Sequence, residues 1–258
     1  MEVIVLPTAL DVGGAAASII SRLVAGNPDA VLGLATGASV KHIYAELALA
    51  HHSHALDFSR VTTFNLDEYV GLSPSHPASY RAFMDEHFLS RVNVDRRRVH
   101  MPPTQGEDLP RLCEQFERDI RAAGGIDLQL LGIGRDGHLG FNEPTSSLAS
   151  RTRIKTLTSV TREANRCAFG GDEVPLHVVT MGIGTILEAR HCLLVAHGPA
   201  KADAVARMVE GPLTAMVPAS ALQMHPRATV IVDEPAAAGL SLRDYYLEVQ
   251  RNKPQWQR

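Results

Sequence analysis

The stretch IDLQLLGIGRDGHLGFNEP, from Ile126 to Pro144, decides how the rest of the chain is interpreted. It opens with an apolar run, Leu128 to Ile133, which predicts a short strand buried on both faces. The run stops at GRDGH, residues 134–138, where two glycines allow the backbone to turn tightly. A buried strand that ends directly in a polar turn is typical of an inner strand of a parallel sheet.

Segments on both sides of this stretch alternate between strand and helix patterns. Strands are predicted at 2–6, 30–35, 58–66, 151–158, 191–196 and 228–232. Helices are predicted at about 9–25, 78–89, 107–123, 201–210 and 240–250. A further helix is predicted to follow the turn at 36–39 and to end at about residue 50. The alternation predicts a single doubly wound α/β domain over residues 1–258, with a mostly parallel sheet and helices on both faces. Residues 158–180 are mixed in composition, contain Gly170-Gly171, and are predicted to form a mobile lid.

The composition excludes several classes of protein. A net charge of −3 and a pI near 6.5 give no basic footprint, so no nucleic-acid partner is expected. We expect no membrane contact, because the N-terminus has no signal pattern and no apolar run is long enough to span a bilayer. The cysteines, Cys113, Cys167 and Cys192, are odd in number and widely spaced, which favours neither a disulfide framework nor a zinc site. A cytoplasmic, reducing location is therefore expected.

Three ionisable side chains follow the central strand closely: Asp136, His138 and Glu143. Acid–base enzymes use such a set, because carboxylates beside a histidine hold its tautomer and its pKa. The alternative is a tight turn whose polar side chains only satisfy backbone groups. On this motif alone, the two interpretations are about equally supported.

The same turn also contains a false lead. Gly132-x-Gly134-x-x-Gly137 matches the dinucleotide-binding fingerprint and follows a strand. That motif needs a helix directly afterwards, because the helix N-terminus binds the pyrophosphate. Gly140 and Pro144 interrupt any helix here, so a nucleotide cofactor is not expected.

Four predicted strands end in unusual polar residues, and in a parallel sheet all of these ends meet at one edge. The four sets are 36–39 (TGAS), Asp67-Glu68, 136–138 (DGH) and Lys201. The backbone N–H groups at 37–39 begin a helix and suit a phosphate, although an ordinary N-cap explains that turn equally well. Lys201 opposes the dipole at a helix start, which an anionic ligand explains better than stability does. With Asp67 as a candidate base, the set indicates proton transfers on a phosphorylated small molecule, without a metal or organic cofactor.

The quoted turn and several further segments resemble the glucosamine-6-phosphate deaminase family. The matching segments are FNLDEYVGL (64–72), HPASY (76–80), GIGRDGHLGFNEP (132–144) and SSLASRTRIKTLT (146–158). The similarity continues through GIGT (182–185), the Lys201 turn and DEP (233–235), and so covers nearly the whole chain. It implies a Rossmann-like fold and the conversion of D-glucosamine 6-phosphate and water into D-fructose 6-phosphate and ammonia.

The resemblance also implies roles for individual residues. Asp67 matches the base that moves a proton between C2 and C1, and His138 the residue that assists opening of the sugar ring. Asp136 and Glu143 match the carboxylates that orient and tune this histidine. The positions that match the family's phosphate-binding residues are Gly37, Ala38, Ser39 and Lys201.

The segment after the catalytic loop matches an activator site in regulated members of the family. Ser146, Arg153 and Lys155 correspond to residues that bind N-acetylglucosamine 6-phosphate at a subunit interface. Alternation along a strand would place Arg153 and Lys155 on one face, although a solvated charged face is the ordinary explanation of such a pattern. The resemblance thus implies a homo-oligomer, with a hexamer as the expected state and this sugar phosphate as an activator.

Two positions depart from the family pattern. Ala38 replaces the second glycine of the usual TGG turn. The family's phosphate-clamping arginine falls at Cys167, whereas Arg166 stands one position earlier, and a one-residue slip would restore the arginine.

Two other functions remain as alternatives. A 6-phosphogluconolactonase shares the fold and a similar DGH turn but has no use for a C2–C1 proton shuttle, so Asp67 and Glu143 favour the deaminase. A non-catalytic sugar-phosphate sensor, as in the effector domains of some repressors, would carry an additional helix-turn-helix segment, whereas this chain opens on a predicted core strand.

Overall fold

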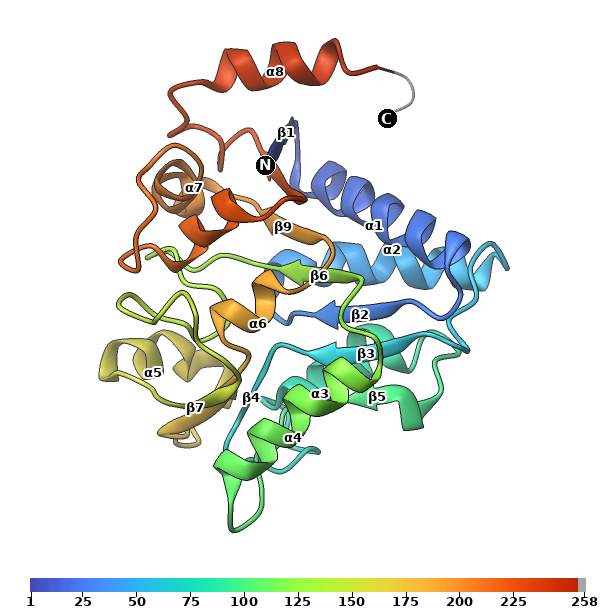
Figure 1. The fold of residues 1–258 in the computed structure, drawn as a ribbon, viewed down its shortest axis with the longest axis vertical. Coiled ribbons are helices and arrows are strands. Elements are labelled where there is room, and N and C mark those ends of the chain that lie inside the picture. The colour runs from blue at the N-terminus through green and yellow to red at the C-terminus, as the bar shows by residue number, and fades with distance from the viewer. Residues whose placement is uncertain (255–258) are drawn as a thin grey trace.

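The computed structural model describes residues 1–254, so Trp256, to which the sequence assigns no role, lies outside the described residues. Its main sheet has the strand order β1-β10-β9-β6-β2-β3-β5, and every pairing in it is parallel. The strands are β1 (Glu2–Leu6), β2 (Val31–Leu34), β3 (Thr62–Asn65), β5 (Val99–His100), β6 (Leu128–Leu131), β9 (Cys192–Ala196) and β10 (Ala228–Asp233). The predicted α/β fold with a mostly parallel sheet is confirmed (Figure 1).

Helices flank this sheet, as the alternating pattern predicted. They are α1 (Ala9–Gly26), α2 (Lys41–His52), α3 (Tyr80–Met84), α4 (Leu109–Ala122), α5 (Ser159–Asn165), α6 (Ile183–Leu187), α7 (Ala202–Val209) and α8 (Arg243–Arg251). Each long helix begins or ends within a few residues of its predicted position. At the start of α1, Thr8 and Asp11 form a reciprocal capping box, which satisfies backbone N–H groups that the helix leaves open.

Helix α1 is long and apolar enough, by length and composition alone, to cross a membrane. Its apolar stripe, which includes Val12, Ile20 and Val24, is instead buried in the protein core. The helix packs against α2 and strands β9 and β10. These contacts are those of an amphipathic helix that covers one face of the sheet in a doubly wound fold.

The order of the strands identifies the edge at which a ligand is expected. From β2 the chain proceeds outward through β3 to β5, and from β6 it proceeds in the other direction through β9 to β10. β2 and β6 are neighbours, so the direction reverses between them, and ligands bind outside the carboxyl ends of strands at such a point. Residues 36–39 follow β2 and residues 132–138 follow β6, which places both polar turns at this crevice.

A second, antiparallel sheet was not predicted. It consists of β4 (Asp67–Tyr69), β8 (His177–Thr180) and β7 (Arg153–Thr156), in that order. The single run predicted at 58–66 ends at Asn65 in β3, and β4 begins at Asp67. β4 has only three residues, which carry too little periodicity to be recognised from sequence, whereas β7 lies within the strand predicted at 151–158.

The predicted lid at 158–180 contains both surface and core elements. It begins with α5 and a 3-10 turn, Arg166–Phe169, and ends in β8, which is paired with β4 on one side and β7 on the other. Val178 and Val179 of β8 are fully buried. The end of the predicted lid is therefore part of a sheet, and mobility stays a prediction for the residues before β8.

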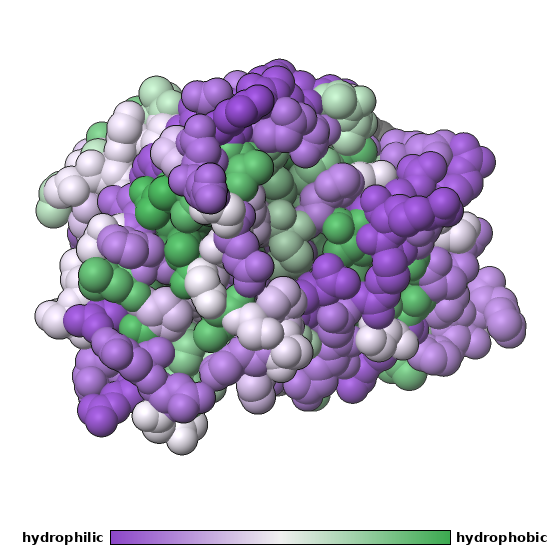
Figure 2. Space-filling view, turned by 90° about the horizontal axis from the view of Figure 1, so that it is seen from below, coloured by the Kyte–Doolittle hydropathy of each residue, from purple (hydrophilic) through white to green (hydrophobic). Residues whose placement is uncertain are grey.

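The surface carries both polar and apolar groups. Seen from below, hydrophilic side chains form most of the raised parts, and apolar side chains gather in patches between them (Figure 2). Scattered apolar groups of this kind are normal for a folded domain.

Candidate active site

The turn after β6 is compact and requires glycine. Gly134 N–H donates to the His138 carbonyl, and Gly137 N–H donates to the Gly134 carbonyl. A Cβ on Gly134 would lie 2.1 Å from the His138 ring, so no larger residue fits there. Gly137 has φ +89°, a left-handed conformation that glycine adopts without strain. These contacts fold the turn back on itself and bring its polar side chains together.

Asp136 and His138 form a direct pair at this turn. His138 Nδ1 lies 2.6 Å from Asp136 Oδ1, which also accepts from the His138 backbone N–H at 3.2 Å. The hydrogen bond to His138 is the main reason that the pKa of Asp136 falls to about 2. The carboxylate is thus ionised at neutral pH and favours a proton on Nδ1, which leaves Nε2 for proton exchange with a ligand. This is the arrangement that an acid–base histidine needs.

Asp67 is buried at the start of β4, with only 6% of its surface exposed. A Cβ on Gly140 would lie 3.2 Å from Asp67 Oδ2, so the base candidate packs directly against the loop that follows His138. Burial, and secondly the charge of Glu68, raises the pKa of Asp67 to about 8. A carboxyl group with a pKa in this range is a much stronger base than a solvated one.

Glu68, beside Asp67, has a structural role. Its carboxylate accepts backbone N–H bonds from Tyr80 at 3.0 Å and Arg81 at 2.8 Å, and so caps the start of α3. This cap fixes β4 against α3. The side chain that the sequence places next to the base therefore helps to hold that base in position.

Glu143 lies at the far end of the same loop. Its Oε1 accepts a hydrogen bond from the Thr161 hydroxyl of α5, which joins the predicted lid to the loop. The preceding residue, Asn142, is fully buried, and its Nδ2 donates to the carbonyls of Leu139 and Met181 at 2.9 and 2.7 Å. Neither Asn142 nor Thr161 was singled out from the sequence. Asn142 could have been found, because it lies within the quoted FNEP motif, whereas no sequence pattern points to Thr161.

Aromatic side chains connect the lid to the loop. The Tyr69 ring lies 5.1 Å from Phe169 and 5.7 Å from Phe141, measured between ring centroids. Tyr69 is the last residue of β4, Phe169 ends the 3-10 turn of the predicted lid, and Phe141 stands two residues before Glu143. The three elements thus share a small apolar cluster of their own.

The predicted phosphate-binding residues lie at two neighbouring turns. Gly37, with φ +109°, precedes the 3-10 turn Ala38–Val40, which contains Ser39 and leads into α2. Lys201 ends the 3-10 turn Pro199–Lys201 before α7, and its Nζ donates to the Ile133 carbonyl at 2.6 Å. The structure therefore brings Lys201 to the start of the turn that carries Asp136 and His138. Burial lowers the pKa of Lys201, and an anionic ligand would reverse part of that shift.

Among the described residues, no contact is found between the Arg166 side chain and these two turns. Its side chain is 68% exposed, and its guanidinium lies 3.4 Å from Glu163 on the same helical segment. Cys167 is a free, exposed thiol. The one-residue slip that would bring Arg166 into the site stays a prediction.

The three candidate activator residues are spread over a loop and β7. Arg153 and Lys155 alternate along β7 opposite Thr180 and Val178, and so share one face as predicted. Arg153 Nη1 donates to Asn142 Oδ1 at 2.9 Å, which links this strand to the loop between His138 and Glu143. The Ser146 hydroxyl is buried, and it has no hydrogen-bond partner among residues 1–254.

Metal binding was not expected from the sequence. In the described part of the chain, no group of three or more His, Cys, Asp or Glu side chains is placed to hold a metal ion.

Comparison with known proteins identifies the family. Residues 8–231 match the family described as glucosamine-6-phosphate isomerases/6-phosphogluconolactonase. The chain belongs to this family. A protein named glucosamine-6-phosphate deaminase from Arthrobacter sp. (strain FB24) is 54% identical over 258 residues, covering 100% of this chain and 99% of the relative. One of the same name from Mycolicibacterium smegmatis (strain ATCC 700084 / mc(2)155) is 52% identical over 259 residues, with the same coverage.

Solved structures of the isomerase/lactonase family support the same grouping. A structure described as a monomeric glucosamine-6-phosphate deaminase matches with a TM-score of 0.90 and 41% identity, covering 93% of this chain and 100% of that one. A 6-phosphogluconolactonase from Trypanosoma cruzi matches with a TM-score of 0.74 and 19% identity, covering 93% of this chain and 97% of that one. The second match shows a shared fold only. The resemblance stated from the sequence motifs is thereby confirmed at the level of the family.

Proposed function

We propose that this chain is a glucosamine-6-phosphate deaminase, which converts D-glucosamine 6-phosphate and water into D-fructose 6-phosphate and ammonia. The observation that carries the proposal is the buried Asp67, packed against Gly140 of the loop that holds the His138–Asp136 pair. A lactonase needs no base that shuttles a proton between two carbons. The relatives that share about half of the sequence over their full length carry the deaminase name.

The proposed reaction begins with opening of the sugar ring. His138 Nε2 moves a proton from the O1 hydroxyl to the ring oxygen, while Asp136 holds Nδ1. Asp67 then takes the proton from C2 and returns it to C1, while the amino group gives up one proton and the C1 oxygen gains one to become a hydroxyl. The nitrogen on C2 becomes an imine, water adds to that carbon, and ammonia leaves to give the ketone. Water is consumed and a C–N bond is cleaved, so the overall change is a hydrolysis coupled to an isomerisation.

The phosphate of the substrate is proposed to bind at the two turns beside this pair. Backbone N–H groups of Gly37, Ala38 and Ser39 at the start of a helical segment suit phosphate oxygens. Lys201 supplies a positive charge, at present bonded to the neutral Ile133 carbonyl. Arg166 is proposed as a further phosphate ligand only if the lid rearranges, because its side chain is directed at Glu163.

Regulation is proposed on the face that carries Arg153 and Lys155, with N-acetylglucosamine 6-phosphate as the activator. The Arg153 guanidinium is half-buried and donates to two neutral oxygens, on Asn142 and Arg151. Burial lowers its pKa, so an anion would be a better partner than the neutral acceptors it now has. The Ser146 hydroxyl is buried and would supply a further donor to such an anion.

A homo-oligomer, with a hexamer as the expected state, is proposed because exposed apolar side chains lie near the segment that starts at Thr145. Leu213 and Met216 are 45% and 54% exposed, and the loop that carries them accepts the backbone N–H of Thr145 at 2.8 Å. Apolar side chains of this size at a surface suit a subunit contact. Because one relative is described as monomeric, the oligomeric state needs direct measurement by analytical ultracentrifugation. A monomer that does not respond to the acetylated sugar phosphate would contradict both proposals.

A cytoplasmic setting is proposed because the exposed Cys167 thiol is free. Free thiols persist in reducing compartments.

One assay tests the proposed activity. Purified protein is incubated with glucosamine 6-phosphate, and ammonia and fructose 6-phosphate are measured together, with 6-phosphogluconolactone as the parallel substrate. Equal amounts of ammonia and ketose are expected, with no acceleration of lactone hydrolysis. Lactone hydrolysis without ammonia release would assign the chain to the other branch of the family. Binding of sugar phosphate without either reaction would indicate the sensor function.

A further inference from the structure

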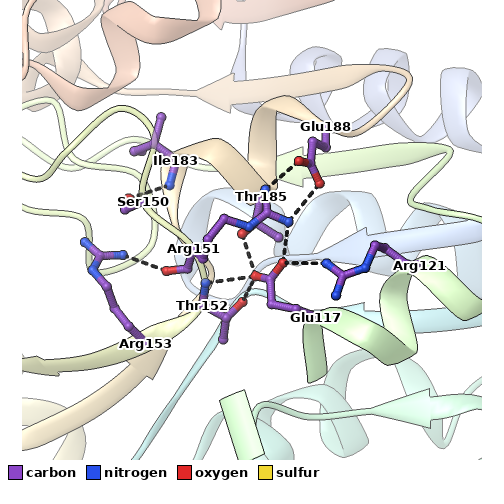
Figure 3. A network of polar contacts seen from close by, with 9 residues as sticks. All are labelled: Glu117, Arg121, Ser150, Arg151, Thr152, Arg153, Ile183, Thr185 and Glu188. Atoms are coloured by element: carbon purple, nitrogen blue, oxygen red, sulfur yellow. Dashed lines mark hydrogen bonds and ion pairs between the residues drawn. The ribbon is translucent and has the colours of Figure 1, made fainter. Parts of the chain in front are cut away.

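Glu117 of α4 is the centre of a buried polar cluster (Figure 3). The residue is only 5% exposed. Its Oε1 accepts three hydrogen bonds. Two come from Thr152, at 2.8 Å from the backbone N–H and 2.5 Å from the hydroxyl, and one comes from the Thr185 hydroxyl at 2.6 Å. Its Oε2 pairs with the Arg151 guanidinium, which also pairs with Glu188. A carboxylate buried to this extent is stable only when it is well satisfied in this way.

The partners of Glu117 fix the segment that leads into β7. Thr152 stands directly before β7, whereas Thr185 lies in α6. The same segment is bound to α6 a second time, because the Ser150 hydroxyl accepts the Ile183 N–H at 3.0 Å (Figure 3). The Ser150 carbonyl also accepts the Gly184 N–H at 2.9 Å. A Cβ on Gly182 would lie 2.0 Å from the Ser150 carbonyl oxygen, so the two segments are in close contact. Residues 150–152 are thus held between α4 and α6.

The strand that starts here reaches the catalytic loop through one side chain. Arg153, the first residue of β7, donates to Asn142 Oδ1 at 2.9 Å. Asn142 Nδ2 also donates to the carbonyls of Leu139 and Met181, so both the oxygen and the nitrogen of this side-chain amide are hydrogen-bonded. The next residue along the chain is Glu143. A shift of β7 would therefore be transmitted to the loop between His138 and Glu143.

We propose that Glu117 is a positioning residue for the catalytic loop, acting through Thr152 and Arg153 on Asn142. Where turnover is the readout, this inference rests on the proposed function, because it assumes that His138 and Glu143 act on the substrate. Its contacts are with the segment before β7, with α6 and with Arg121 at 3.9 Å, and the structure thus assigns it to support rather than to chemistry. A displacement of about 1 Å in a catalytic group can lower a rate by about a hundredfold, so support of this kind affects turnover measurably.

The two threonines provide a matched pair of variants. Both hydroxyls donate to the same oxygen of Glu117, and both residues are buried, but only Thr152 lies on the path to Arg153. Thr152→Val and Thr185→Val should lower the melting temperature to a similar extent. We expect Thr152→Val to lower kcat by about threefold to tenfold with KM within about twofold, and Thr185→Val to leave kcat within about twofold. Glu117→Gln, if it folds, should lower kcat by more than Thr152→Val, whereas Glu188→Gln should not lower it.

A second readout does not depend on the activity. Amide hydrogen exchange is measured on the peptide that contains residues 138–146, in which Asn142 N–H donates to the Leu139 carbonyl and Ser146 N–H to the Glu143 carbonyl. Faster exchange is expected in Thr152→Val but not in Thr185→Val. If the parent protein released no ammonia, the proposed function would fail, and this comparison would still test the positioning role. If both variants lowered the melting temperature as expected but Thr152→Val left kcat and exchange at the values of Thr185→Val, the inference would be overturned.

Discussion

Replacing Asp67 with asparagine removes a buried ionisable group and the proposed base in one step. In the folded protein the pKa of Asp67 is about 8, because the group is buried and secondly because Glu68 lies beside it. In an unfolded chain an aspartate has a pKa of about 4. The unfolded chain therefore releases this proton at lower pH, and the folded state becomes progressively less favoured as the pH rises from about 4 to about 8.

The size of this effect follows from the shift. pH 7 lies about three units above the pKa of aspartate in the unfolded chain and still below the pKa of Asp67 in the folded protein. At about 1.36 kcal/mol per unit, the folded state has therefore lost about 4 kcal/mol of folding free energy at pH 7. Asparagine does not ionise and avoids this loss, so Asp67→Asn should raise the free energy of unfolding by up to about 4 kcal/mol at pH 7. For a chain of this length that corresponds to a melting temperature about 10 °C higher. At pH 5 the gain should shrink to about 1.5 kcal/mol.

The same substitution should lower turnover, since an amide cannot accept the C2 proton. Removing a general base typically lowers kcat by about 10²- to 10⁴-fold. The assays are thermal unfolding at pH 5 and pH 7, and ammonia release under saturating substrate. Asp203→Asn is a suitable control, because its carboxylate is 77% exposed and pairs only with Arg207 among the contacts found in residues 1–254; both quantities should stay near the parent values. A variant with normal turnover and no gain in stability at pH 7 would refute the reasoning.

Four further predictions test the remaining parts of the site. Lys201→Ala should raise KM more than it lowers kcat, because the phosphate does not react; equal KM values for the variant and its parent would remove Lys201 from the phosphate site. Asp136→Asn should lower kcat by about 10²-fold or more, since the amide no longer favours a proton on His138 Nδ1, and a normal rate would show that this tautomer is irrelevant. Cys167→Arg should lower KM if that position clamps the phosphate, whereas a rise in KM in Arg166→Ala would show that Arg166 supplies the clamp instead. Turnover should persist in EDTA, and activity that is lost there and restored by a divalent cation would contradict the metal-free reaction.

Much of the fold could be predicted because its inner strands are continuous apolar runs. β6, β9 and β10 are buried along their whole length, and such runs bounded by polar turns are a strong signal. The short strands β4 and β8 were not predicted, because each is defined by its pairing with the other and not by a pattern of its own. The same limit applied to the end of the predicted lid, where β8 belongs to a sheet.

The candidate site was predictable where residues lie close together in sequence. Asp136 and His138 are two positions apart, and their pairing follows from the turn. The contact of Asp67 with Gly140 depends on how β4 is placed against the loop, which only the tertiary structure shows. The role of Glu117 was invisible for the same reason, since it is 35 residues from Thr152 in the chain. Within a helix whose other face is polar, a buried glutamate has no sequence signature.

The most direct test of the account follows the hydrogen on C2 of the substrate. Glucosamine 6-phosphate carrying deuterium at C2 is incubated with the protein in ordinary water, and the fructose 6-phosphate formed is examined by NMR. If the buried Asp67 carries this hydrogen to C1, part of the deuterium should appear at C1, and kcat/KM should show a primary isotope effect. Fructose 6-phosphate with only solvent hydrogen at C1, formed without an isotope effect, would contradict the proposed role of Asp67.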